Sequence, residues 1–120
     1  MRTESFMTYG RATFLNAELM KWFENHAQGG HLSERWHREP LHAPDHRGVA
    51  PAWIGLAQCD PLTDEGVLYA DRLRLAGVPV DLEIYAGVVH GFIQFGRAIP
   101  EALTAHNDAA RALRRAFGDH

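Results

Sequence analysis

Apolar residues recur at helical spacing in one segment near each end of the chain. In residues 12–28 the apolar face consists of Leu15, Leu19, Trp22, Phe23 and His26. Residues 99–117 show the same period in a stripe made of Ile99, Leu103, His106, Ala110, Leu113 and Phe117. Gly29-Gly30 and Gly118 follow these segments, as glycine commonly follows the last turn of a helix. Both segments are therefore predicted to be amphipathic helices.

Two segments between these helices have the patterns of β-strands. Residues 52–59 are almost continuously apolar, which is typical of a strand buried on both faces. Residues 80–85 alternate strictly between apolar and polar side chains, which predicts a strand nearer a sheet edge. Residues 62–76 carry an apolar helical face and are followed by glycine and proline. The order strand, helix, strand predicts a βαβ unit with parallel strands and a right-handed crossover.

Asp60 and His90 follow the two predicted strands directly or closely. Because the carboxyl ends of parallel strands meet at one edge of a sheet, both residues are expected at the same edge, where open α/β sheets bind their ligands. An aspartate beside a histidine makes two thirds of an acyl-transfer triad. Taken alone, Asp60 could equally cap the following helix, and His90 is more typical of an ordinary loop histidine.

The residues around Asp60 and His90 form two blocks that are more specific together than apart. They read Asp60-Pro61-Leu62-Thr63-Asp64-Glu65-Gly66 and His90-Gly91-Phe92. At this spacing they resemble the C-terminal end of the α/β-hydrolases, in the hormone-sensitive-lipase-like branch of esterases and lipases. The resemblance extends over roughly residues 10–118. It implies that Asp60 is the acid and His90 the base of a catalytic triad.

The same resemblance implies a domain organisation. The chain is expected to be an α/β protein with a partial α/β-hydrolase fold, a βαβ unit of the last two parallel strands flanked by an N-terminal and a C-terminal helix. Residues 1–120 are then the C-terminal part of a single hydrolase domain. It is expected to contain a cap or connector helix in residues 12–30, a loop in residues 31–51 and a strand–helix–strand–helix series in residues 52–118.

A nucleophile is the part of the triad that the sequence does not supply. The family serine lies in a G-x-S-x-G elbow, with an upstream H-G-G-G loop that forms the oxyanion hole. Ser5 and Ser33 lie in other contexts, and Gly29-Gly30-His31 does not match the oxyanion loop. The resemblance therefore implies a carboxylic ester hydrolase fragment that is inactive alone and needs no cofactor.

The loop histidines and the single cysteine are two further candidates for chemistry, and each has a simpler interpretation. Four histidines crowd the loop of residues 31–51: His31, His37, His42 and His46. The loop has no cysteine and no H-x-x-x-H pair on a helix, so solvated histidines are favoured and no metal is expected. Cys59 stands beside the acid and not at a nucleophile elbow, so inert packing is favoured over catalysis.

Two alternative functions stay open. The chain could be a non-catalytic α/β module that dimerises, or that complements a separate N-terminal half, through the apolar edge of residues 52–59. The terminal Asp…His order also fits a dienelactone-hydrolase-like or prolyl-peptidase-like enzyme. The expected partners are a small-molecule ester substrate, if the chain is complemented, and either a second copy or an N-terminal hydrolase half.

Composition narrows the partners and the compartment. Twelve basic against fifteen acidic residues give a formal net charge of −3, which argues against nucleic-acid binding. The single cysteine excludes an intramolecular disulfide. No apolar run approaches the length of a membrane span, and the first residues lack the apolar core of a signal peptide. A soluble, cytoplasmic protein is therefore expected.

Overall fold

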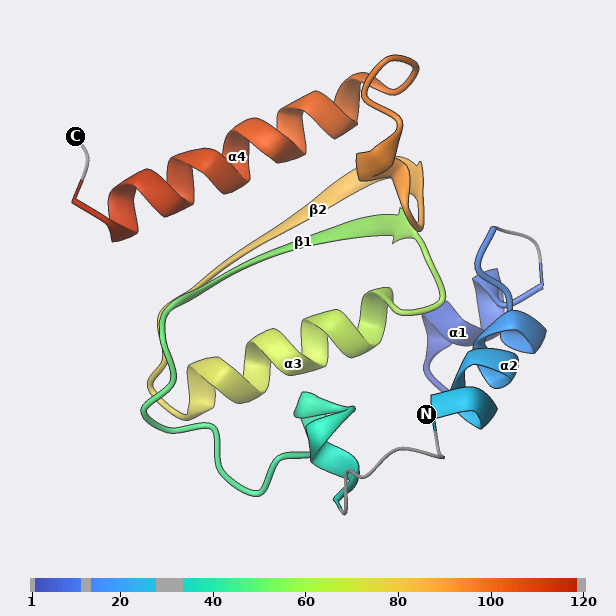
Figure 1. The fold of residues 1–120 in the computed structure, drawn as a ribbon, viewed down its shortest axis with the longest axis horizontal. Coiled ribbons are helices and arrows are strands. Elements are labelled where there is room, and N and C mark those ends of the chain that lie inside the picture. The colour runs from blue at the N-terminus through green and yellow to red at the C-terminus, as the bar shows by residue number, and fades with distance from the viewer. Residues whose placement is uncertain (1, 12–13, 28–33, 119–120) are drawn as a thin grey trace.

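A two-stranded parallel sheet lies between two helices in the computed structural model (Figure 1). The structure describes residues 2–11, 14–27 and 34–118. Its helices and strands, in chain order, are α1 (Glu4–Tyr9), α2 (Ala17–Ala27), β1 (Ala52–Cys59), α3 (Thr63–Leu75), β2 (Val80–Val89) and α4 (Pro100–Ala116). Short 3₁₀ turns occur at η1 (Arg35–His37), η2 (Pro40–His42) and η3 (Phe92–Gln94). No helix in the described ranges is long and apolar enough to cross a lipid bilayer.

The predicted βαβ unit is confirmed. β1 and β2 pair in parallel, with Ala52 opposite Val80 and Ala57 opposite Tyr85. Helix α3 lies on one face of the sheet and α4 on the other (Figure 1). The bounds of β1 are as predicted, but β2 continues to Val89 beyond the predicted residues 80–85, because an irregularity interrupts its alternation without ending its pairing.

Helix α3 fits closely against β1. A Cβ atom on Gly66 would lie only 2.5 Å from Leu56 Cδ2, so this position requires glycine or a shift of the leucine. Ala70 and Leu73 lie on the same side of the helix and are completely buried, at 0% and 1% exposed. Acidic residues in its first turn and arginines in its last turn complement the helix dipole.

Helix α4 contacts the sheet through alanines and not through its larger apolar residues. Ala102 and Ala105 are buried against Tyr85 and Phe92. Leu103 and Leu113, both in the predicted apolar stripe, are each 56% exposed. The aromatic side chains fill the space between the layers, so only small residues allow the helix to approach. Tyr85 Oη also donates a hydrogen bond to Asp108 Oδ2 at 2.6 Å, which ties α4 to β2.

The N-terminal region differs from the prediction. Helix α1 was not predicted, and the described part of the helix expected in residues 12–30 contains α2, which begins only at Ala17 and has no buried residue. Its expected stop at Gly29-Gly30 lies outside the described residues. The loop of residues 31–51 carries η1 and η2 in its described part. The apolar spacing in residues 12–28 therefore marked an exposed helix, and a helix of six residues is too short to show a period.

Helices α1 and α3 cap each other across 59 positions of sequence. The Ser5 N–H donates to Asp64 Oδ2 at 2.8 Å, and the Asp64 N–H donates to Ser5 Oγ at 3.0 Å. The Ser5 hydroxyl also donates to the Pro61 carbonyl at 3.1 Å. Because Leu62 at the start of α3 offers no side-chain cap, the buried Ser5 hydroxyl takes over that task.

Replacing Ser5 with alanine should lower the free energy of unfolding by about 1–2 kcal/mol, because the Asp64 N–H and the Pro61 carbonyl lose a buried partner. Urea denaturation followed by circular dichroism measures this loss. Thr8→Ala, at an exposed position of α1, is the control and should change stability by less than about 0.5 kcal/mol. Equal effects of the two variants would contradict the mutual cap.

Tyr85 makes the fold sensitive to alkaline pH. Burial, followed by the hydrogen bond to Asp108, raises the pKa of the Tyr85 phenol. A raised pKa in the folded state contributes stability below the ordinary tyrosine pKa of about 10, and that stability is lost as pH rises through the folded value. Tyr85→Phe should therefore be about 1–2 kcal/mol less stable than the parent at pH 8, and the difference should shrink above pH ~10. Urea denaturation at several pH values tests this, with Tyr69→Phe as the control. A constant difference would contradict it.

Candidate functional site

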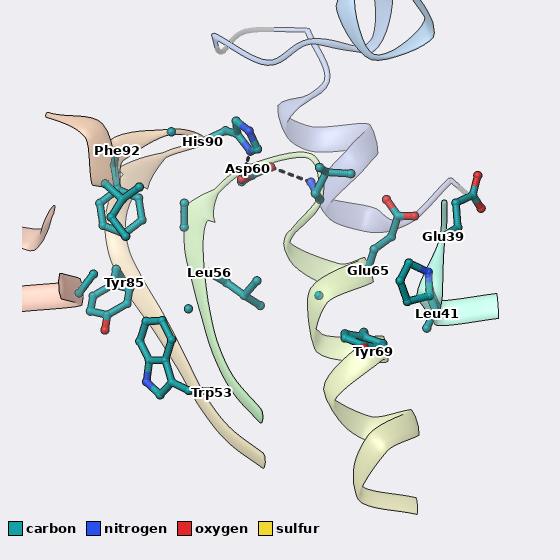
Figure 2. A pocket seen from close by; sticks show the side chains of 18 of the residues that line it. Glu39, Leu41, Trp53, Leu56, Asp60, Glu65, Tyr69, Tyr85, His90 and Phe92 are labelled. Atoms are coloured by element: carbon teal, nitrogen blue, oxygen red, sulfur yellow. Dashed lines mark hydrogen bonds and ion pairs between the residues drawn. The ribbon is translucent and has the colours of Figure 1, made fainter. Parts of the chain in front are cut away.

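The structure brings Asp60 and His90 together at the edge where β1 and β2 end (Figure 2). His90 Nδ1 lies 2.7 Å from Asp60 Oδ2. The other carboxylate oxygen, Oδ1, accepts the N–H of Leu62 at 2.8 Å. A carboxylate only accepts, so His90 Nδ1 carries the proton in this contact and Nε2 keeps a lone pair in the neutral ring.

The two side chains differ in their exposure to solvent. The Asp60 side chain is 11% exposed, whereas the His90 side chain is 45% exposed. Within the described part of the chain, His90 Nε2 has no hydrogen-bond partner. The carboxylate is thus shielded from water and held at both oxygens, while the far side of the imidazole is open to a reacting group.

The turn that carries Asp60 is held by its own neighbours. Thr63 Oγ1 lies within hydrogen-bond distance of the Ala57 carbonyl, at 2.5 Å, and of the Asp60 carbonyl, at 2.9 Å. Pro61 is among the fully buried side chains. On the other strand, Gly91 adopts a left-handed conformation with a φ of 80°, which turns the chain directly after His90.

A groove of about 470 Å³ runs past the site along the open edge of β1. Side chains on both sides of β1 line it (Figure 2). Leu56 of β1 lies with Glu65 and Tyr69 of α3 on one side, and Trp53 of β1 lies with Tyr85 of β2 and Phe92 of η3 on the other. Burial raises the pKa of the Glu65 carboxyl. The groove lies along an edge of β1 that no other described strand covers.

The backbone of β1 presents hydrogen-bonding groups to this groove. The Ala52 N–H donates to the Pro79 carbonyl, next to β2, at 3.0 Å. Strand alternation then turns the N–H and C=O groups of Trp53, Gly55 and Ala57 to the opposite edge. All three residues line the groove. Of the residues in β1 only Ala57 is buried, so the expected burial on both faces is not found.

Other side chains named from the sequence have partners outside the Asp60–His90 pair. The Ser5 hydroxyl is engaged with Pro61 and Asp64, and Ser33 lies outside the described residues. The Cys59 thiol hydrogen-bonds to Tyr9 and thereby raises the pKa of the Tyr9 phenol.

The loop histidines are dispersed. His42 Nε2 lies 3.2 Å from Glu39, and His46 Nε2 contacts the Pro40 carbonyl at 2.8 Å. His37 packs against Trp36, and His31 lies outside the described residues. In the described ranges, no three histidine, cysteine, aspartate or glutamate side chains converge as metal ligands.

Two contacts near the site have no signal in the sequence. They are the mutual cap of Ser5 and Asp64, and a hydrogen bond from the Gly87 N–H to Gln58 Oε1 at 2.8 Å. Each joins residues at least 29 positions apart. A local pattern carries no signal for such contacts, and Gly87, whose φ is 73° in the structure, lies beyond the predicted strand of residues 80–85.

Known proteins resemble this chain over most of its length. Ethyl acetate hydrolase from Pseudomonas putida is 38% identical over 104 residues, which are 84% of this chain and 32% of that protein. Carboxylesterase NlhH from Mycobacterium tuberculosis is 43% identical over 73 residues, 61% of this chain and 23% of that protein. A hyperthermophilic esterase from the archaeon Pyrobaculum calidifontis superposes with a TM-score of 0.84 at 31% identity, covering 96% of this chain and 38% of that one.

The chain spans about a third of the length of the ethyl acetate hydrolase. The family model described as the α/β-hydrolase fold matches residues 1–94, which include both Asp60 and His90. The chain therefore belongs to the α/β-hydrolase family, with a partial α/β-hydrolase fold and relatives that are esterases.

Proposed function

We propose that this chain supplies the acid and the base of a carboxylic ester hydrolase. The observation that carries the proposal is the 2.7 Å contact between His90 Nδ1 and Asp60 Oδ2 at the ends of adjoining parallel strands. The shielding of Asp60 and the exposure of His90 suit these two roles. The esterase names of the relatives favour esters of carboxylic acids as the substrate class.

In this mechanism Asp60 holds His90 in the tautomer that protonates Nδ1. His90 Nε2 accepts the proton of a nucleophilic hydroxyl as its oxygen attacks the ester carbonyl carbon. The Asp60 carboxylate stabilises the imidazolium that results. His90 then returns the proton to the departing alcohol oxygen, leaving an acyl-enzyme. Water then attacks the acyl-enzyme while His90 Nε2 accepts its proton. The carboxylic acid is released as that proton returns to the oxygen of the nucleophile.

The nucleophile and the oxyanion donors belong, in this proposal, to a further part of a hydrolase domain. Ser5 is occupied as a helix cap, and neither Ser5 nor Ser33 lies in a G-x-S-x-G elbow. The chain alone is therefore inactive as an esterase. In the same proposal the groove along β1 receives a strand from that further part, and this strand forms hydrogen bonds with the backbone of Trp53 and Gly55.

The surface next to the groove supports such a partner. Trp53 and Leu113 line a second hollow of about 290 Å³ at the start of β1. Leu103 and Phe117, from the same stripe of α4, are 56% and 80% exposed. Since an isolated pair of strands is marginally stable, covering these groups stabilises both the sheet and the helix.

A chimera tests the catalytic roles. When this chain replaces the matched 104-residue segment of the Pseudomonas putida ethyl acetate hydrolase, the product should hydrolyse p-nitrophenyl butyrate, whereas this chain alone should not. Asp60→Asn should lower kcat in the chimera by about 10³–10⁴-fold, because the amide favours the wrong histidine tautomer. His90→Ala should cost at least as much.

The matched control is His37→Ala, at an exposed position away from the pair, which should leave kcat within twofold. Circular dichroism and gel filtration establish that each variant is folded. A folded chimera whose activity survives Asp60→Asn, or that has none, would refute the proposed roles.

The alternative function is a module that acts by association alone, and the unpaired apolar edge of β1 favours it. In that case two copies pair through β1. Size-exclusion chromatography with light scattering should then give a dimer of about 27 kDa, twice the chain mass of 13.5 kDa. Replacing Gly55 with proline should disrupt it, because proline removes an N–H from this edge. A well-folded monomer would exclude the association module.

A further inference from the structure

An irregularity in β2 determines which residue faces Asp60. Ala57 pairs with Tyr85, but Cys59 pairs with Val89, so one residue of β1 stands opposite three residues of β2. Continuing the first register without a shift would place Val88 opposite Asp60. The two extra residues of β2 place His90 there instead. The Asp60–His90 contact therefore depends on this bulge.

Side-chain burial shows the same shift independently. Tyr85 and Val88 both belong to the core beneath α4, at 8% and 7% exposed. They are three positions apart, and in a regular strand an odd separation places side chains on opposite faces. The bulge of residues 86–88 reverses the alternation of β2 side chains between the two faces of the sheet. It thereby determines on which side of the sheet the backbone lies as it reaches His90.

One side chain contacts the middle of this bulge. Gln58 is the residue of β1 that stands opposite it, and Gln58 Oε1 accepts the N–H of Gly87 at 2.8 Å. Gly87 has a φ of 73°, which a residue with a Cβ rarely adopts. A Cβ at this position would meet no atom within 4 Å, so the requirement is conformational and not one of space.

We propose that Gln58 is a positioning residue for the base: its side-chain oxygen holds the bulge of residues 86–88, and the bulge keeps His90 Nδ1 against Asp60. Gln58 does not touch the reacting atoms, and it acts through Gly87. Its effect on catalysis rests on the proposed function, whereas its effect on the Asp60–His90 contact does not. The hydrogen bond between Gln58 and Gly87 is exposed, so water competes for the Gly87 N–H. Losing the Gln58 oxygen should therefore weaken the positioning of His90 without abolishing it.

Two substitutions separate the hydrogen bond from the shape of the side chain. Gln58→Met keeps an unbranched chain of similar length but loses the oxygen, and Gln58→Glu keeps an acceptor oxygen. Gln94→Ala, at an exposed position of η3 whose own side chain forms no hydrogen bond among the described residues, is the control. Gly87→Ala tests the bulge from the other strand, through its φ.

The first readout is made on this chain alone and needs no activity. In NMR spectra the proton on His90 Nδ1 should give a low-field resonance, and Asp60→Asn identifies it. Gln58→Met and Gly87→Ala should broaden or shift that resonance, and Gln58→Met should speed hydrogen exchange of the Gly87 amide about 3- to 10-fold. Gln58→Glu and Gln94→Ala should leave both signals near the parent. An unchanged His90 resonance in folded Gln58→Met would overturn the proposal.

The second readout uses the chimera described above. Gln58→Met should lower kcat about 3- to 10-fold with KM within twofold, because the substrate still binds while the base is aligned less often. Gln58→Glu should restore most of the loss. An effect of Gln58→Glu as large as that of Gln58→Met, or of Gln94→Ala as large as either, would overturn the proposal. A chimera without activity refutes the proposed function, and the NMR readout then still decides the role of Gln58.

Discussion

The parallel pairing of β1 and β2 is the constraint on which the rest of the molecule depends. Parallel strands end at the same edge of a sheet, so a crossover helix must return the chain across one face before the second strand begins. Helix α3 makes that return, and Gly66 lets it lie close against Leu56. This brings Asp60 and His90, which are thirty positions apart, together, so that His90 Nδ1 lies 2.7 Å from Asp60 Oδ2.

The pairing was predictable from sequence because each of its parts leaves a local pattern. Each part has its own pattern: a nearly continuous apolar run in residues 52–59, a helical face in residues 62–76 and an alternation in residues 80–85. The two motif blocks pointed to Asp60 and His90. The bulge was not predictable, since a hydrogen bond between Gln58 and Gly87 follows no period. The mutual cap of Ser5 and Asp64 was hidden for the same reason.

Helix α4 shows a different limit of periodicity. The predicted stripe of residues 99–117 contains the larger apolar side chains, whereas alanines that include Ala102 and Ala105 recur on another face. The helical period alone does not decide which of the two faces is buried. The structure buries Ala102 and Ala105 because Tyr85 and Phe92 already occupy the space beneath them. The buried face of α4 thus depends on the volume of Tyr85 in β2 and of Phe92 in η3. No pattern within residues 99–117 contains information about the size of these two side chains.

The open edge of β1 connects the packing of the sheet with the candidate site. A strand with a nearly continuous apolar sequence is suited to a neighbour on each side, and here β1 has a described neighbour on one side only. The same edge carries the groove that passes Asp60, so whatever covers β1 also closes the site around His90. In the proposed function stability and chemistry are therefore coupled, because an added strand would satisfy the backbone of Trp53 and Gly55 and would end beside the exposed imidazole, where a nucleophile is required.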